Sequence, residues 1–185
     1  MPTGVSACLF WASFVAWLVY VGRLLVAERA SDQDAGTSRL LLVCTWGALA
    51  LGFVAASQLD GQRLPAGALA VGLLLVWLGL ALSEWARREL GRHYHPVVAI
   101  DEAHAVITSG PYRVIRHPIY AGRLLCLVGF GLAMQNGLSV GACFVLPLAG
   151  FAARIIVEER ALRDATGDDY ARYMTTTRRL VPGVW

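Results

Sequence analysis

The sequence predicts an all-α, polytopic integral membrane protein, and three observations lead to this fold class. Hydrophobic residues make up 57% of the 185 residues and charged residues only 16%. In a soluble domain about 25% of the residues are charged. The second observation is the mean hydropathy of the chain, which is +0.55. The third observation is the arrangement of the apolar residues, which form stretches of membrane-spanning length separated by polar segments.

Five stretches approach the roughly 17–25 apolar residues that a membrane-spanning helix needs. The fourth is short and contains Arg123. Pro118 precedes it at a position that the first turn of a helix tolerates, and an arginine near a helix end can extend its charge to the membrane surface. We therefore expect about five transmembrane helices, at residues 5–21, 40–56, 64–82, 119–134 and 138–157.

Two of these helices are expected to continue beyond the membrane. The third runs on to Gly91 and the fifth to Gly167, and a short last helix with an acidic first turn begins at Asp168, because glycine favours helix ends and acidic residues favour helix starts. Between the third and fourth helices, two short extended segments are predicted around an acidic turn at residues 101–102. This loop and the C-terminal tail predict a small cytoplasmic cap.

The distribution of arginines predicts the orientation in the membrane, since all 16 basic residues are arginines. The first loop, the third loop and the tail contain almost all of them, whereas the second loop has only Arg63 and the turn at residues 135–137 has none. Because cytoplasmic loops carry the excess of positive charge, we expect the C-terminus and the polar segments in the cytoplasm and the N-terminus outside. We expect the membrane to be a bacterial or archaeal cell membrane.

The remaining composition excludes several classes of function. The four cysteines all lie in apolar stretches without metal-like spacing, so they are read as small hydrophobic residues. His93 and His95 have metal-like spacing if this segment is extended, but the sequence assures no carboxylate or cysteine partner for them, and we expect no metal. The net charge of +3 is not concentrated in a basic run, so no nucleic-acid partner is expected. Membrane lipids are the expected surroundings.

Residues 110–122, with the sequence GPYRVIRHPIYAG, form the most polar approach to an apolar stretch. The Gly-Pro pair signals a turn and Pro118 can begin a helix, so the residues between them have little backbone freedom. A helix N-terminus offers unpaired N–H groups and a partial positive charge, which suit an anionic group of a cofactor. The alternative is that Arg113 and Arg116 are lipid-headgroup anchors and His117 an interface residue.

A second polar cluster lies at the end of the fifth apolar stretch. Arg154 and Glu158 are four residues apart and share a helix face, and Glu159 follows directly. Ionisable groups at membrane depth are costly and indicate a functional site by default; the alternative is a structural salt bridge between Arg154 and Glu158. The two clusters flank one helical hairpin, which can bring them together in a pocket at the membrane surface.

The combined motifs resemble the isoprenylcysteine carboxyl methyltransferase family, with its phospholipid methyltransferase relatives. They are GPYRxxRHPxYxG at 110–122, RxxxEE at 154–159, GxxYxxY at 167–173 and RLVPGVW at 179–185, and they cover roughly the last 90 residues. The resemblance implies S-adenosylmethionine as cofactor, S-adenosylhomocysteine as product and a lipophilic or prenylated acceptor. This chain has Asn136-Gly137 where members often have Asn-Pro, and eukaryotic carboxyl methyltransferases have more spans.

Carried over residue by residue, the resemblance places Arg154 and Glu158 beside the reacting methyl group as the catalytic residues. It also divides a single membrane domain, 1–185, into a three-span part at 1–90 and a cofactor-binding and catalytic part at 91–185. The residues that it places against the cofactor are Tyr112, Arg116, His117, Pro118, Tyr120, Gly122 and Glu159.

The chemistry of methyl transfer agrees with these residue types. A carboxylate acceptor is ionised at neutral pH and needs no general base, while Arg154 can clamp it with its forked donors. For an amine acceptor, Glu158 or His117 would accept the proton. We therefore predict carboxyl O-methylation of an isoprenylcysteine-like substrate. The alternatives are a phospholipid or small-amine N-methyltransferase, an NADPH-dependent sterol-reductase-like enzyme and a non-catalytic membrane scaffold.

Overall fold

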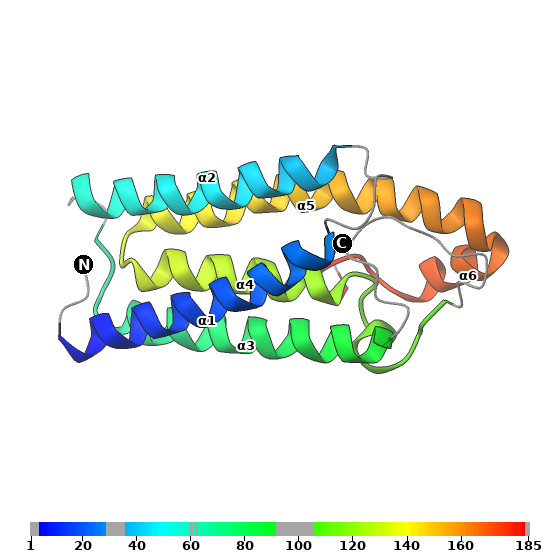
Figure 1. Cartoon of the computed structure of the whole chain (residues 1–185), viewed down its shortest axis with the longest axis horizontal. Coiled ribbons are helices and arrows are strands. Elements are labelled where there is room, and N and C mark those ends of the chain that lie inside the picture. The colour runs from blue at the N-terminus through cyan, green and yellow to red at the C-terminus, as the bar shows by residue number, and fades with distance from the viewer. Residues whose placement is uncertain (1–3, 29–35, 60, 62, 92–105, 184–185) are drawn as a thin grey trace.

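The computed structural model describes residues 4–28, 36–59, 61, 63–91 and 106–183 (Figure 1). Within these ranges the chain forms helices and two isolated β-bridges, so the predicted all-α class is confirmed. The elements in chain order are α1 (Val5–Glu28), α2 (Thr37–Gln58), α3 (Gly67–Leu90), the 3₁₀ turn η3 (Gly110–Arg113), α4 (Pro118–Ala133), α5 (Gly137–Thr166) and α6 (Asp168–Thr176).

The five longer helices lie lengthwise beside one another, and α6 lies at one end of the bundle (Figure 1). The main contacts are between α3 and α4, between α2 and α5, and between α4 and α5, while α1 crosses the α3 and α4 pair. The α4–α5 hairpin is therefore the centre of the bundle. The polar residues of the predicted site occupy the open end of this hairpin.

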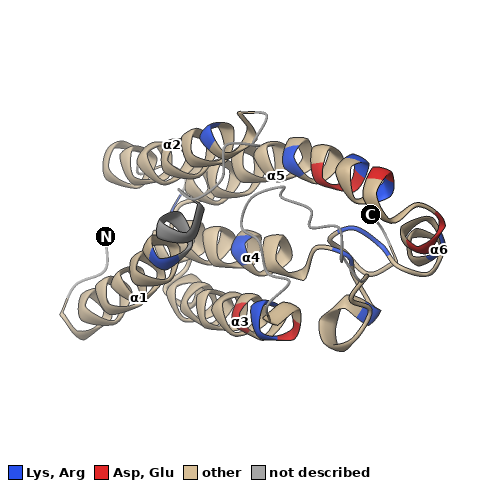
Figure 2. Ribbon diagram, turned by 45° about the vertical axis from the view of Figure 1, so that its right-hand side comes forward, with Lys and Arg blue, Asp and Glu red and all other residues tan. Residues whose placement is uncertain are grey.

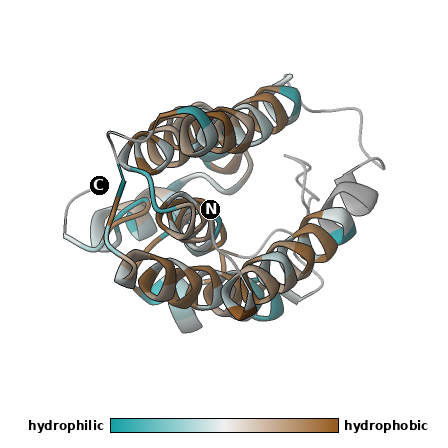
Figure 3. Cartoon of the chain, turned by 90° about the vertical axis from the view of Figure 1, so that its left-hand side faces the viewer, coloured by the Kyte–Doolittle hydropathy of each residue, from teal (hydrophilic) through white to brown (hydrophobic). Residues whose placement is uncertain are grey.

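In the described part of the chain, four helices are long and apolar enough to cross a membrane: α1, α2, α3 and α5. Helix α4 is apolar but has only 16 residues, so the fourth predicted span, at residues 119–134, remains a prediction. Hydrophobic residues are found all around the long helices, on their outer faces as well as toward the interior (Figure 3), as expected when lipid surrounds a bundle. Exposed examples are Leu9, Val15, Val43, Leu74, Trp77 and Val145.

Small residues bring α3 and α4 into backbone contact. A Cβ atom added to Gly72 would lie 2.5 Å from the Gly129 carbonyl oxygen, and one added to Gly79 would collide with the Gly122 carbonyl oxygen. Helices in membranes associate through such close packing, because lipid supplies little hydrophobic driving force. Gly131 is pressed against Val140 of α5 in the same way.

The turn between α4 and α5 is fixed by Asn136. Its side-chain oxygen accepts hydrogen bonds from the backbone N–H groups of Leu138 and Ser139 at 3.0 and 3.2 Å, which caps the start of α5. Its amide nitrogen donates to the carbonyl oxygens of Ala55 and Leu59 at 3.3 and 2.9 Å. One buried side chain therefore joins the hairpin to the end of α2.

The predicted helix ends are confirmed. Helix α3 ends at Leu90 and α5 ends at Thr166, and the glycines that follow, Gly91 and Gly167, have φ angles of 51° and 56°. This left-handed backbone favours glycine and stops a helix. The predicted extended segments around residues 101–102 fall mainly on residues 92–105, which lie outside the described residues, as do His93 and His95.

Candidate active site

The approach to α4 is a rigid turn followed by a helix start. Residues Gly110–Arg113 form η3, and the Tyr112 N–H donates to the Ser109 carbonyl oxygen at 3.1 Å. Pro118 is the first residue of α4 and is buried. The sequence prediction of a turn, a constrained segment and a proline-initiated helix is confirmed.

The C-terminal tail lies directly beside this segment. The backbone N–H of Arg116 donates to the Arg178 carbonyl oxygen at 2.7 Å, and the N–H of His117 donates to the Arg179 carbonyl oxygen at 3.0 Å. Leu180, the next residue, is buried in the hydrophobic core of the bundle. The tail therefore occupies the N–H groups of residues 116 and 117, which the sequence analysis had left open for an anionic ligand.

Glu159 is the centre of the charged cluster and is 1% exposed. One carboxylate oxygen accepts from Arg116 Nε at 2.9 Å and lies 3.4 Å from His117 Nε2. The other accepts from Arg179 Nε and Nη2 at 2.9 and 2.8 Å. A buried carboxylate is tolerated only when it is paired and hydrogen-bonded, and here both oxygens are used. Glu159 therefore joins the end of α5, the start of α4 and the tail.

An aromatic stack and a second carboxylate lie next to this cluster. The Tyr120 ring stacks on His117 and on Phe151, with ring centroids 5.8 and 5.4 Å apart. The Tyr120 hydroxyl donates to Glu158 Oε2 at 2.9 Å. Tyr120 thus connects the residues around Glu159 with the face of α5 that holds Glu158.

Arg154 is 2% exposed and is held by the first turn of α2. Its Nη1 donates to Thr37 Oγ1 at 2.6 Å and to Ser38 Oγ at 3.3 Å. These two hydroxyl groups were not predicted from the sequence. Thr37 lies 117 positions before Arg154 in the chain, and no helical spacing relates the two residues. Glu158, the partner proposed from the helix spacing, accepts a hydrogen bond from the Tyr120 hydroxyl.

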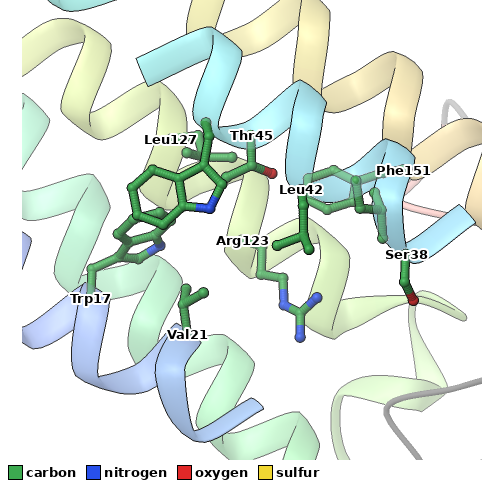
Figure 4. Close-up of a pocket in the computed structure, with 10 residues that line it drawn as sticks. Trp17, Val21, Ser38, Leu42, Thr45, Arg123, Leu127 and Phe151 are labelled. Atoms are coloured by element: carbon green, nitrogen blue, oxygen red, sulfur yellow. The ribbon is translucent and has the colours of Figure 1, made fainter. Parts of the chain in front are cut away.

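An apolar pocket lies between α1, α2, α4 and α5 (Figure 4). Ser38, which accepts from Arg154, is on its wall. The lining residues are Trp17, Val21, Ser38, Leu41, Leu42, Thr45, Trp46, Arg123, Leu127 and Phe151.

The structure brings most of the predicted site residues together and places two in neighbouring interfaces. Arg116, His117, Tyr120, Glu158 and Glu159 contact one another directly. The Tyr112 carbonyl oxygen accepts a hydrogen bond of 2.7 Å from Tyr173 of α6, and Gly122 packs against Gly79 and Ser83 of α3.

Tyr173 and Arg179 are site-forming residues that the sequence analysis did not single out. Burial raises the pKa of Tyr173 to about 12, so its phenol remains a donor to Tyr112 at neutral pH. Among the described residues no group of three or more metal-ligating side chains is found.

Comparison with known proteins agrees with this class of fold and site. The family model described as phospholipid methyltransferase matches residues 68–168, from the first turn of α3 into the start of α6. The match covers more than half of the chain, and the chain belongs to this family. The resemblance to isoprenylcysteine carboxyl methyltransferases and their phospholipid methyltransferase relatives is confirmed, and it extends into α3, beyond the motifs seen in the sequence.

Several curated proteins and solved structures are similar to the chain. A probable protein-S-isoprenylcysteine O-methyltransferase of Oryza sativa subsp. indica is 36% identical over 105 residues, which cover 56% of this chain and 55% of that protein. Protein-S-isoprenylcysteine O-methyltransferase B of Arabidopsis thaliana is 34% identical, with coverages of 61% and 58%. The cobalt-zinc-cadmium resistance protein CzcN of Cupriavidus metallidurans is 33% identical, with coverages of 70% and 59%.

One similar solved structure is that of the eukaryotic intramembrane Ras methyltransferase ICMT. It has a TM-score of 0.66 and 22% identity, and the match covers 77% of this chain and 52% of that one, so it supports the fold. The chain spans little more than half the length of the curated relatives that it matches. The expectation of a bacterial or archaeal membrane is contradicted by the eukaryotic relatives, and only the assignment to a membrane is kept.

Proposed function

We propose that the chain transfers a methyl group from S-adenosylmethionine to the carboxylate of a lipophilic, isoprenylcysteine-like acceptor. One observation carries this proposal. The start of α4 and the end of α5 converge on a charged cluster, and an apolar pocket opens at Ser38, which accepts a hydrogen bond from Arg154. An amphiphilic acceptor needs this combination of an apolar compartment for its chain and a polar end for its reacting group.

The residues of the cluster suit a sulfonium cofactor. S-adenosylmethionine, when bound, supplies an electrophilic methyl group, an ammonium, a carboxylate and an adenine ring. Glu158 can offset a positive charge, Arg116 and Arg179 can attract a carboxylate, and the His117–Tyr120 stack offers aromatic faces. Because Glu159 already uses both oxygens within the protein, we assign it to holding the two arginines in place.

In carboxyl methylation an acceptor oxygen bonds to the methyl carbon, and the carbon–sulfur bond breaks with its electron pair going to sulfur. No proton moves, so no general base is required. Two opposite charges disappear in this reaction, and a site that excludes water therefore favours it. Arg154 positions the carboxylate, while the apolar walls near Trp17 and Phe151 keep water away.

We also propose that the charged end of the bundle faces the cytoplasm. Arginines gather at the ends of α3 and α5 on the side where α6 lies (Figure 2), and cytoplasmic segments carry the excess of such residues. The test is a pair of topology reporters fused after Trp185, one active only in the cytoplasm and one only outside it. Activity of the second reporter alone would contradict this orientation.

The experiment that tests the function is isothermal titration of the detergent-purified full chain. We expect S-adenosylhomocysteine to bind and NADPH not to bind. His117→Ala should weaken the binding of S-adenosylhomocysteine by about 1–3 kcal/mol, the cost of leaving a buried polar partner unsatisfied. Arg172→Gln is the control, since Arg172 is 78% exposed on α6. Binding of NADPH alone would favour the reductase alternative, and binding of neither ligand would favour the scaffold.

A further inference from the structure

The apolar pocket between α1, α2, α4 and α5 is elongated along the bundle. Ser38 lies at one of its ends and Trp17 at the other, with Leu42 and Thr45 between them (Figure 4). On α2 the lining extends from Ser38 to Trp46, a span of about 12 Å at the helical rise of 1.5 Å per residue. The pocket therefore suits an extended hydrocarbon chain better than a compact ligand.

The Ser38 end of the pocket is continuous with the predicted catalytic residues. Ser38 lines the pocket and accepts a hydrogen bond from Arg154 at 3.3 Å. Phe151 also lines the pocket, and its ring stacks on that of Tyr120, whose hydroxyl donates to Glu158. A molecule whose polar group lies at the charged cluster therefore has the pocket available for its apolar part.

Trp17 closes the other end of the pocket and is only 2% exposed. Its ring packs against the rings of Phe14, Phe130 and Trp46, with centroids 5.8, 5.6 and 5.9 Å away. Phe14 and Phe130 are not among the described residues that line the pocket, so they support the Trp17 ring from behind. Because protein interiors are closely packed, this ring cannot move aside without displacing the phenylalanines.

We propose that Trp17 limits the length of the hydrocarbon group that the pocket holds and makes the protein selective for acceptors with a short prenyl group. The inference rests on the proposed function, because it takes the polar group of the acceptor to lie at the charged cluster. The length of an extended geranyl group is comparable to that of the pocket. Farnesyl and geranylgeranyl groups are longer and reach the Trp17 ring before their last isoprene units are accommodated.

The fit of the prenyl group decides this selectivity, because its removal from water does not. Before it binds, the prenyl group is dissolved in lipid or detergent, which is as apolar as the pocket. A group that fits gains close contacts with the aromatic end, whereas a longer group must bend at the Trp17 ring, and forcing extra methylene groups into a packed site is unfavourable. We therefore expect the affinity to decrease from geranyl through farnesyl to geranylgeranyl acceptors.

The test measures the binding of three probes with the same polar group to the full chain in detergent, without any methyl transfer. They are N-acetyl-S-geranylcysteine, N-acetyl-S-farnesylcysteine and N-acetyl-S-geranylgeranylcysteine. Each affinity is expressed per mole fraction of probe in the micelles, so that differences in partitioning into detergent cancel. The wild type should bind the geranyl probe at least fivefold more tightly than the geranylgeranyl probe, and equal affinities would contradict the inference.

Variants of Trp17 separate length selection from general packing. Trp17→Ala removes the end of the pocket and should raise the affinity for the geranylgeranyl probe relative to the geranyl probe at least fivefold. Trp17→Phe keeps an aromatic ring, so it should remain folded if the alanine variant does not, and should shift this ratio in the same direction by a smaller factor. Trp77→Ala is the control, because Trp77 is 54% exposed on α3 and lies outside the described lining of the pocket. A ratio that no Trp17 variant changes, or that Trp77→Ala changes equally, would overturn the inference.

The failure of this inference is distinguishable from that of the proposed function. Titration with S-adenosylhomocysteine reports on the proposed function, and Trp17→Ala should bind it like the wild type. A protein that binds the cofactor product but binds the three probes equally keeps the proposed function and loses this inference. A protein that selects among the probes by length but does not bind the cofactor product has the reverse outcome.

Discussion

The α3–α4 interface and the charged cluster around Glu159 are both buried and both join α4 to a neighbour, but different forces hold them. Gly72 and Gly79 let the backbones of α3 and α4 touch, so the fit depends on the absence of side-chain atoms. The cluster depends on three cationic or polar partners around one carboxylate. One contact tolerates no added volume, and the other tolerates no lost charge.

This difference teaches which part of the chain carries the fold and which part carries the site. Close packing fixes α4 against α3, and the hydrogen bonds between the two helices include those of Ser83, which donates to the Ile119 carbonyl oxygen at 3.3 Å, and of Cys126, whose Sγ donates to the Val76 carbonyl oxygen at 3.3 Å. The charged cluster then positions the tail on a hairpin that is already placed. We therefore expect volume changes in the interface to affect assembly, and charge changes in the cluster to affect ligand binding first.

The largest effect is expected from Gly79→Val. The added side chain would collide with the backbone of α4 at Gly122, and backbone cannot yield as a flexible side chain does. We expect no monodisperse, folded protein in size-exclusion chromatography after detergent extraction. Gly47→Ala on α2 is the matched control, because an added Cβ there meets no atom within 4 Å. A well-folded Gly79→Val variant would show that α3 and α4 are not locked together.

Glu159→Gln should have the next largest effect. It removes one partner of a buried ion-pair cluster, which costs about 3–5 kcal/mol because the remaining charges are left uncompensated. We expect a lower thermal midpoint and weaker binding of S-adenosylhomocysteine. Asp169→Asn is the control, since the Asp169–Arg172 pair is 70% and 78% exposed and such a pair contributes at most about 1 kcal/mol. If Glu159→Gln and Asp169→Asn changed the thermal midpoint and the ligand affinity equally, the buried cluster would contribute no more than an exposed ion pair.

Thr37→Val should act on turnover without acting on the fold. It deletes the hydroxyl that accepts from Arg154 at 2.6 Å while keeping the size of the side chain. Loss of a hydrogen bond to a charged group is expected to lower kcat by about tenfold, equivalent to about 1.4 kcal/mol. The affinity for S-adenosylhomocysteine should not change. Thr175→Val on the exposed face of α6 is the control, and an unchanged kcat in Thr37→Val would show that Thr37 does not position Arg154.

Tyr173→Phe should give the smallest effect. The lost hydrogen bond to the Tyr112 carbonyl oxygen should cost about 1 kcal/mol of stability at neutral pH. Because the pKa of Tyr173 is raised from 10.0 to about 12 in the folded chain, its contribution is complete below pH 10 and is lost as the pH rises through 12. Thermal midpoints between pH 8 and 12 should therefore fall less steeply for the variant. If the thermal midpoints of the wild type and of Tyr173→Phe fell in parallel with pH, the loss of stability at alkaline pH would come from other groups.

The sequence predicted local features of the fold well, because its signals for them are local. Pro118 marks the start of α4, Gly91 and Gly167 mark helix ends, and the apolar stretches mark the long helices. The contacts of Arg154 with α2 and of Glu159 with Arg179 were not predicted. They join residues that no helical or strand periodicity relates, and only the packing of the bundle brings them together.

The central claim is that the cluster at the open end of the α4–α5 hairpin transfers methyl groups to a lipophilic carboxylate with Arg154 as its clamp. The measurement is the transfer of labelled methyl from S-adenosylmethionine to N-acetyl-S-farnesylcysteine by the wild type and by Arg154→Lys, with the affinity for S-adenosylhomocysteine determined in parallel. We expect transfer by the wild type, and at least a tenfold lower kcat with unchanged affinity in Arg154→Lys, because lysine keeps the charge but loses the planar fork. Near wild-type transfer by Arg154→Lys, or by the double variant Arg154→Leu with Glu158→Leu, would contradict the claim.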